Sequence, residues 1–207
     1  MLASASPRRR ELLSLLGIPF EVRPAEVAEE FGDGTRPEIV ARRLAREKAE
    51  AARLADGTTP ILAADTVVVL DSAMLGKPAD GDEARRMLQA LRGQTHEVIT
   101  AVAVLPLGER GALIRHPATS VTMRAYSDAE IAASIARGDP FDKAGAYAIQ
   151  DGVFRPVESY EGCYCNVVGL PLWSTMELLQ KAGLPVGVEA GDLLPQCAAC
   201  PLRPPGA

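Results

Sequence analysis

The apolar and polar positions of the chain predict helices and strands in turn. An almost unbroken apolar run at residues 61–70 predicts a buried strand. Apolar residues at three- and four-residue spacing predict a long helix that ends near Ala55. Shorter strand-like segments are residues 2–4, 20–23, 96–104, 113–114 and 120–123. Because helices and strands alternate for most of the length, the pattern predicts an α/β protein.

Start and stop residues place the helices. Ser6 and Pro7 suit the cap and first position of a helix that runs to Gly17. Two sequences resemble capping boxes, and each has Glu three residues after Thr or Ser. These are residues 35–38, before the long helix, and 127–130, before a helix ending near residue 138. Further helices are expected from residue 80 or 82 to 91 and from 171 to 182.

Composition and charge narrow the class of protein. The 207 residues are 47% hydrophobic and 24% charged, which is typical of a globular chain and excludes disordered, collagen-like and coiled-coil classes. Asp65 interrupts the longest apolar stretch, far short of the ~20 residues of a membrane span. The net charge of −5 is untypical of nucleic-acid-binding proteins, which usually carry a basic face. The first ten residues reverse the charge order of a secretory signal, so we expect a cytoplasmic protein.

The four cysteines fall in two pairs, Cys163/Cys165 and Cys197/Cys200. The second pair has metal or redox spacing, but along the sequence no second such pair and no suitably placed His joins it. Zinc binding is therefore the less favoured alternative. We expect residues 184–207 to be a loose, reduced, Pro-rich tail that contributes little to the core of a domain formed by residues 1–183.

Several charged residues occupy positions that local stability disfavours. Arg8 and Arg9, followed by Arg10, lie in the first turn of a helix, where the dipole is positive. Such a cluster suits phosphate oxygens, although the arginines could equally extend into water or pair with Glu11 and Glu26.

Two lysines are candidates for binding an anion. Lys48 falls within the apolar stripe of the long helix, so it either extends along its own stem to water or meets an anion in a cleft. Lys77 lies on a stiff turn between Gly76 and Pro78, which by itself is a weak indication.

The buried strand carries a single charge. A buried carboxylate at Asp65 needs a cation, a metal or several donors, and Thr66 beside it offers a hydroxyl. The alternative is that Asp65 caps a turn at the end of the strand.

Gln150 follows a run of small residues. It could hydrogen-bond the edge of a base, or it could be a core amide whose hydrogen bonds are satisfied within the protein. The two histidines, His96 and His116, are interpreted as structural.

Seven short stretches, in order along residues 2–182, together resemble the Maf family, also known as septum formation inhibitor proteins and nucleoside triphosphate pyrophosphatases. They are LASASPRR (2–9), AREKA (45–49), ADTVV (64–68), GKP (76–78), GQTH (93–96), KAGAYAIQ (143–150) and CYCNVVGLP (163–171). The resemblance implies a fold like the inosine triphosphate pyrophosphatases: an elongated mixed twisted sheet flanked by helices, with two lobes and a central cleft.

The resemblance also implies a reaction: a nucleoside triphosphate and water give the monophosphate and pyrophosphate, with magnesium or manganese. By position, the triphosphate would be held by Ser4, Arg8, Arg9, Lys48 and Lys77. Asp65 would be the proton acceptor or a metal ligand, and Arg8, Thr66 and Gln150 would influence base choice. The residues at 146–150 and 166–171 look like the branch that takes dTTP and UTP. Asp151 departs from the Gly often found there, and an acidic family position aligns only loosely near Glu29.

Two functions of different classes follow. The first is a metal-dependent nucleoside triphosphate pyrophosphatase whose partner is the small-molecule substrate, with no nucleic acid and no membrane; a homodimer is one of the assemblies that the resemblance allows. The second is a non-catalytic regulator of septum formation that binds a nucleotide or a protein. Asp65 favours the enzyme, because pure phosphate binding would gain nothing from an added negative charge.

Overall fold

A computed structural model describes residues 1–25, 27–28, 34–56, 59–109, 111–188 and 193–205, with the side chains of residues 54–56 left out. Glu26 and Glu29 therefore lie outside the described residues. None of the helices found in the described part is both long and apolar enough to span a bilayer.

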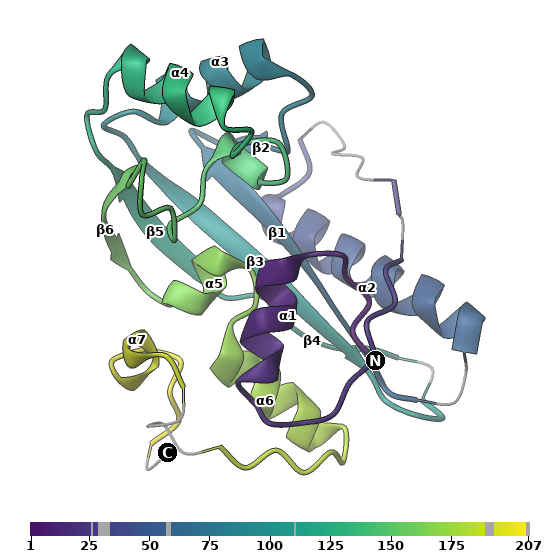
Figure 1. The fold of residues 1–207 in the computed structure, drawn as a ribbon. Coiled ribbons are helices and arrows are strands. Elements are labelled where there is room, and N and C mark those ends of the chain that lie inside the picture. Colours follow the sequence, from purple (N-terminus) through teal and green to yellow (C-terminus); the bar gives the residue numbers. More distant parts are fainter. Residues whose placement is uncertain (26, 29–33, 57–58, 110, 189–192, 206–207) are drawn as a thin grey trace.

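In the described part of the chain six strands form one sheet, which confirms the α/β class (Figure 1). Its order is β2-β1-β3-β5-β6, and β4 also pairs with β3. All pairings between these strands are antiparallel, and the parallel contacts are single bridges from Leu2 to Val22 and to Leu62. The strands are β1 (Ile61–Leu70), β2 (Ala73–Leu75), β3 (Thr95–Leu105), β4 (Leu113–Arg115), β5 (Ala118–Met123) and β6 (Val157–Glu161).

The helices begin mostly where the sequence predicts. They are α1 (Pro7–Ser14), α2 (Pro37–Asp56), α3 (Gly81–Leu91), α4 (Asp128–Ala136), the 3-10 turn η1 (Ala144–Ala146), α5 (Tyr164–Val168), α6 (Leu172–Lys181) and α7 (Pro195–Ala198). The capping box of Ser127 and Glu130 is confirmed, and Ser6 caps α1. The box expected at Thr35 is wrong by one position: the Val40 N–H donates to the Arg36 carbonyl, because Pro37 opens the helix.

Helices cover both faces of the sheet (Figure 1). Alternate residues of β1 point to opposite faces. Ile61, Ala63 and Val67 pack with α2, whereas Leu62 and Ala64 pack with α1, α5 and α6. Helices α3 and α4 pack with η1 at the end of the sheet where β1 meets β2. Consecutive residues of β1 can therefore serve two sides of one site.

The C-terminal segment packs on the core, so the expectation of a loose tail is wrong. Val186, Leu193, Cys197 and Cys200 are buried in the cluster that contains α1, α5 and α6. The indole N–H of Trp173 donates to the Cys197 carbonyl at 3.1 Å. Prolines prevent long helices in this segment, but they do not prevent its apolar side chains from being buried.

Candidate active site

A gap along the edge of β1 opens into the site. On the edge away from β3, the Ala3 N–H donates to the Leu62 carbonyl at 2.8 Å, and pairing with β2 begins only at Val68. Among the described pairings, no strand covers residues 63–67 on this edge. A cavity of about 710 Å³ lies there, within the size range of small-molecule sites.

All eight residues to which the resemblance assigns a role line this one cavity, whereas Arg10 does not: they are Ser4, Arg8, Arg9, Lys48, Asp65, Thr66, Lys77 and Gln150. Asp142, Lys143 and Tyr147 line it as well, and the sequence reasoning did not single them out. Their signal was their position within or directly before the small-residue run at 144–148. The described lining carries five basic and two acidic side chains, so it suits an anionic ligand.

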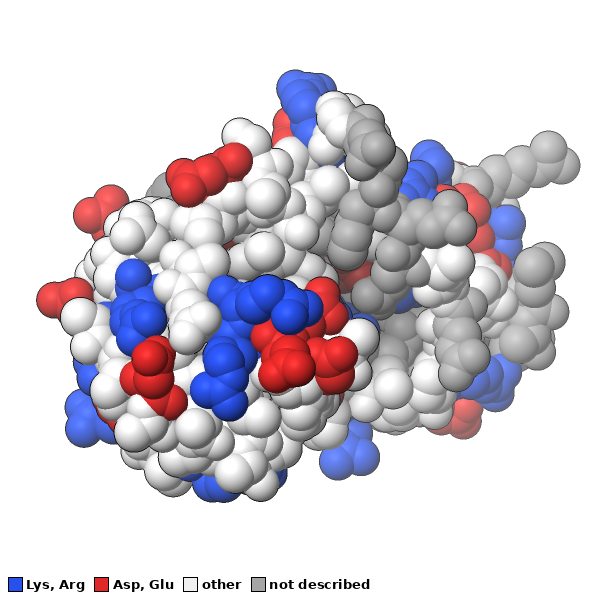
Figure 2. Space-filling view, turned by 90° about the horizontal axis from the view of Figure 1, so that it is seen from above, with Lys and Arg blue, Asp and Glu red and all other residues white. Residues whose placement is uncertain are grey.

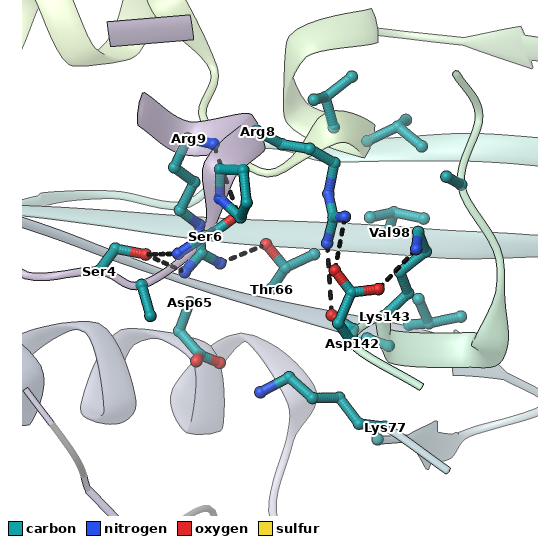
Figure 3. Close-up of a pocket in the computed structure, with 18 of the residues that line it drawn as sticks. Ser4, Ser6, Arg8, Arg9, Asp65, Thr66, Lys77, Val98, Asp142 and Lys143 are labelled. Carbon is teal, nitrogen blue, oxygen red and sulfur yellow. Dashed lines mark hydrogen bonds and ion pairs between the residues drawn. The ribbon is translucent and has the colours of Figure 1, made fainter. Parts of the chain in front are cut away.

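Asp65 and Lys48 meet at the α2 side of the cavity. The Lys48 ammonium lies 2.6 Å from Asp65 Oδ1, and the two side chains are 11% and 7% exposed. Lys48 therefore meets an anion in the cleft, as one of its two interpretations held. Figure 3 shows Lys77 pointing toward Asp65 from the turn after β2. The alternative for Asp65, a cap at the end of the strand, is wrong because it lies in the middle of β1.

Arg9 lies on the opposite side of β1 from Asp65 (Figure 3), and three residues hold its side chain. Its Nε donates to the Gly169 carbonyl at 2.9 Å, and its guanidinium contacts Thr66 Oγ1 at 3.0 Å and Ser4 Oγ at 3.4 Å. Thr66 in turn contacts the buried Thr100 at 3.0 Å. A guanidinium fixed in this way is oriented before any ligand arrives, which lowers the entropy cost of binding.

Arg8 crosses the cavity to the segment before η1. Its guanidinium lies 2.9 Å from Asp142 Oδ2, and Lys143 also contacts this carboxylate. Burial alone would raise the pKa of Asp142, but the hydrogen bonds from Lys143 and Arg8 outweigh it and lower the pKa. Asp142 therefore holds two cations at the cavity while remaining ionised.

A glycine brings the walls of the cavity together. The Gly145 N–H donates to the Gly76 carbonyl at 3.0 Å, which joins η1 to the turn that carries Lys77. Gly145 has φ +68°, and a Cβ there would lie 3.1 Å from Val68 Cγ1. Both the positive φ and the close approach require glycine.

His96 supports the site from behind, as its structural interpretation predicts. Its Nε2 lies 2.7 Å from the Tyr147 hydroxyl, and the residue is 4% exposed. Burial lowers the pKa of His96 to about 4, so the imidazole is neutral at pH 7. Burial also raises the pKa of Tyr147. This neutral pair fixes one side of the cavity wall.

The surface outside the cavity is mixed in charge. On the face seen from the end of α3 and α4, basic and acidic side chains are interspersed (Figure 2). The attraction for an anion therefore comes from the lining of the cavity rather than from that face as a whole.

Asp65 is the lining carboxylate that suits a divalent cation. Within the described ranges, no group of three or more His, Cys, Asp or Glu side chains is set up as a metal centre. Mg²⁺ commonly binds through one or two carboxylates together with substrate phosphates and water, and a single Asp65 in a basic cavity fits that mode. Asp142 fits it less well, because Arg8 and Lys143 contact both of its carboxylate oxygens, whereas Lys48 contacts Oδ1 of Asp65.

Comparisons with known proteins show which family the chain belongs to. The sequence model of the family described as "Maf-like protein" matches residues 1–182. A dTTP/UTP pyrophosphatase of Thermomicrobium roseum is 55% identical over 99% of this chain and 94% of its own length. Relatives with the same name from Citrifermentans bemidjiense and Anaeromyxobacter dehalogenans are 47% and 50% identical over 88% and 90% of this chain, and each is covered over 95% of its length. The chain therefore belongs to the family of Maf-like proteins.

Proposed function

We propose that this chain hydrolyses dTTP and UTP to the nucleoside monophosphate and pyrophosphate. The observation that carries the proposal is the meeting of a buried carboxylate, Asp65, with the basic side chains of one cavity. The names of the similar proteins supply the substrate class. A site that only bound phosphate would be weakened by Asp65, whereas hydrolysis requires a group that handles water.

The triphosphate would be bound by Ser4, Arg8, Arg9, Lys48 and Lys77. These side chains come from three separate segments of the chain, and the cavity brings them to the gap beside β1. Arg9 is oriented in advance by Gly169 and Thr66. When substrate enters, Arg8 would either leave Asp142 and contact phosphate oxygens or contact both at once.

Asp65 would orient the attacking water and accept its proton. The water oxygen forms a bond to the α-phosphorus, and the bond from that phosphorus to the bridging oxygen breaks. Pyrophosphate leaves with the electron pair of this bond, and the basic side chains neutralise the charge that develops on it. Lys48 holds the Asp65 carboxylate at 2.6 Å and so fixes its direction.

Magnesium or manganese, held by Asp65 together with phosphate oxygens, would add charge neutralisation on the phosphates.

Base choice would involve Arg8, Thr66 and Gln150. Thr66 acts through Arg9, which it contacts at 3.0 Å, while Gln150 lines the cavity. Asp151 does not line it. Its Oδ1 accepts the N–H groups of Val153 and Phe154, each at 2.8 Å, so it stabilises the turn after Gln150. Asp151, which stands where the family often has Gly, therefore does not displace the side chains that would contact the base.

The test measures pyrophosphate and orthophosphate separately, with a panel of canonical and modified triphosphates in the presence of Mg²⁺ or Mn²⁺. We expect pyrophosphate from dTTP and UTP, and a loss of at least roughly 100-fold in Asp65→Asn. Asp71→Asn, an exposed change in the turn after the same strand, is the matched control and retains activity. Nucleotide binding without any product would refute hydrolysis and support the regulator instead.

Three expectations from the sequence stay predictions. These are a location in the cytoplasm, partners that include neither nucleic acid nor membrane, and an assembly that could be a homodimer. The division into a domain of residues 1–183 and a tail of residues 184–207 is also part of the proposal, with the correction that the tail packs on the domain.

A further inference from the structure

The four cysteines of the chain meet in the core, away from the active-site cavity. Cys163 caps α5, Cys165 lies within it, and Cys197 and Cys200 lie in and after α7. The four residues are between 1% and 6% exposed. All four thiols are free of disulfide bonds. The fold thus brings the Cys-x-Cys pair to the Cys-x-x-Cys pair, although 31 residues separate Cys165 from Cys197 in the sequence.

Two of the sulfur atoms are as close as those of a metal site. Cys165 Sγ lies 3.5 Å from Cys197 Sγ. Cys163 and Cys200 are buried in the same cluster of side chains. In a tetrahedral zinc–thiolate site with Zn–S of about 2.3 Å, neighbouring sulfurs are ~3.8 Å apart. The observed spacing is therefore near the spacing that zinc requires.

Hydrogen bonds hold the backbone on both sides of the cysteine cluster. The Cys163 N–H donates to Thr119 Oγ1 at 3.1 Å, and the Trp173 indole N–H donates to the Cys197 carbonyl at 3.1 Å. Contacts of this kind orient the ligands of metal sites from outside. They are an observation independent of the sulfur spacing.

We propose that Cys163, Cys165, Cys197 and Cys200 bind one structural zinc ion that fastens the C-terminal segment to the domain. Over the part of the chain that the structure describes, no three potential ligands already converge on one metal position. Loading therefore draws the four sulfurs together by side-chain rotation, and each thiol gives up its proton as it binds.

The site would also support the active site from behind. The Asn166 amide, one residue after Cys165, accepts the Thr100 N–H at 3.1 Å and donates to the Val98 carbonyl at 2.8 Å. Thr100 contacts Thr66, which contacts Arg9. Zinc at the start of α5 would thus stiffen the elements that orient Arg9 without touching the substrate.

The first experiment measures metal in the full-length chain, purified without chelators and without a histidine tag. We expect inductively coupled plasma mass spectrometry to find about one zinc ion per chain. A mercurial reagent should release this zinc as it titrates four thiols. Added Co²⁺ should give the charge-transfer and d–d bands of a tetrahedral thiolate site in the zinc-free chain.

Two variants separate this site from the active site. Cys197→Ser/Cys200→Ser should lose zinc, whereas Asp65→Asn should retain it. The thiol titration needs no variant, so the test holds even if the double variant does not fold. Three results would each overturn the proposal. The first is a chain that, after zinc has been supplied, holds less than about 0.1 zinc ion per molecule. The others are a folded double variant that binds as much zinc as the original chain, and a Cys165–Cys197 disulfide in the freshly isolated chain.

Discussion

Removing the Lys48 ammonium tests the buried ion pair at the centre of the site. Lys48→Met keeps the length and the apolar stem of the side chain but leaves the Asp65 carboxylate without the donor at 2.6 Å. Breaking a fully buried pair costs about 3–5 kcal/mol. Because the cavity admits water to a pair that is 11% and 7% exposed, we expect a smaller loss of about 2–3 kcal/mol in the free energy of unfolding.

The same change should slow the reaction. Loss of a cation that contacts the triphosphate and directs Asp65 should remove about 2–3 kcal/mol of transition-state stabilisation, which is a fall of roughly 30- to 150-fold in kcat/KM. Urea unfolding followed by the fluorescence of the buried Trp173 gives the stability, and pyrophosphate release from dTTP gives the kinetics.

A double-mutant cycle with Asp65→Asn isolates the pair. We expect Lys48→Met/Asp65→Asn to be more stable than Lys48→Met alone, with a coupling energy above about 1 kcal/mol, while activity stays lost. Lys181→Met is the matched control: Lys181 pairs with Glu177 at 2.6 Å but is 52% exposed, so about 0–0.5 kcal/mol is expected. Additive effects of the two site changes, or a Lys48→Met variant as stable as the original chain, would refute the reasoning.

Three further changes probe the surroundings of the site. Arg9→Lys cannot reproduce the fork that holds Gly169, so kcat/KM should fall about 10- to 100-fold with little change in stability; unaltered steady-state kinetics would count against this role. Gly145→Ala places a Cβ 3.1 Å from Val68 at φ +68°, and urea unfolding should show a loss of about 1–2 kcal/mol rather than the gain usual for Gly→Ala elsewhere. His96 has a folded-state pKa of about 4, below its usual 6.5, so the unfolded chain binds more protons between these values and stability falls as pH drops from 6.5 to 4. The loss reaches at most about 3 kcal/mol, and His96→Gln should flatten the slope; identical slopes in urea titrations from pH 4 to 7 would contradict it.

Much of the site could be predicted because several of its charged residues lie at positions where local stability disfavours a charge. Asp65 inside an apolar strand and Lys48 inside an apolar stripe are each costly alone, and the structure places them together. The alternation of a strand already places Asp65 and Thr66 on opposite faces, but the sequence could not show which helix covers each face. Asp142 was missed because an exposed acidic residue in a loop is ordinary and gives no signal in the sequence.

The long elements were predicted better than the short ones. The apolar run at residues 61–70 matches β1 to the residue, and Ser127 caps α4 as expected. Helix α5 and strand β6 were not predicted. Each is five residues long, too short for a hydrophobic period to emerge, and each depends on tertiary contacts.

The C-terminal segment shows the limit of reading neighbours along the chain. Cys197 and Cys200 were judged against nearby sequence, where no second pair occurs. Their neighbours in space, Cys163 and Cys165, lie more than 30 residues earlier. Only the packing of α7 against α5 and α6 brings the two pairs together.

Hydrolysis of dTTP in ¹⁸O-labelled water tests most directly the claim that water attacks the α-phosphorus beside Asp65. Mass spectrometry of the products should find one ¹⁸O in the monophosphate and none in the pyrophosphate. Label in the pyrophosphate, or release of labelled orthophosphate with a nucleoside diphosphate, would contradict the account.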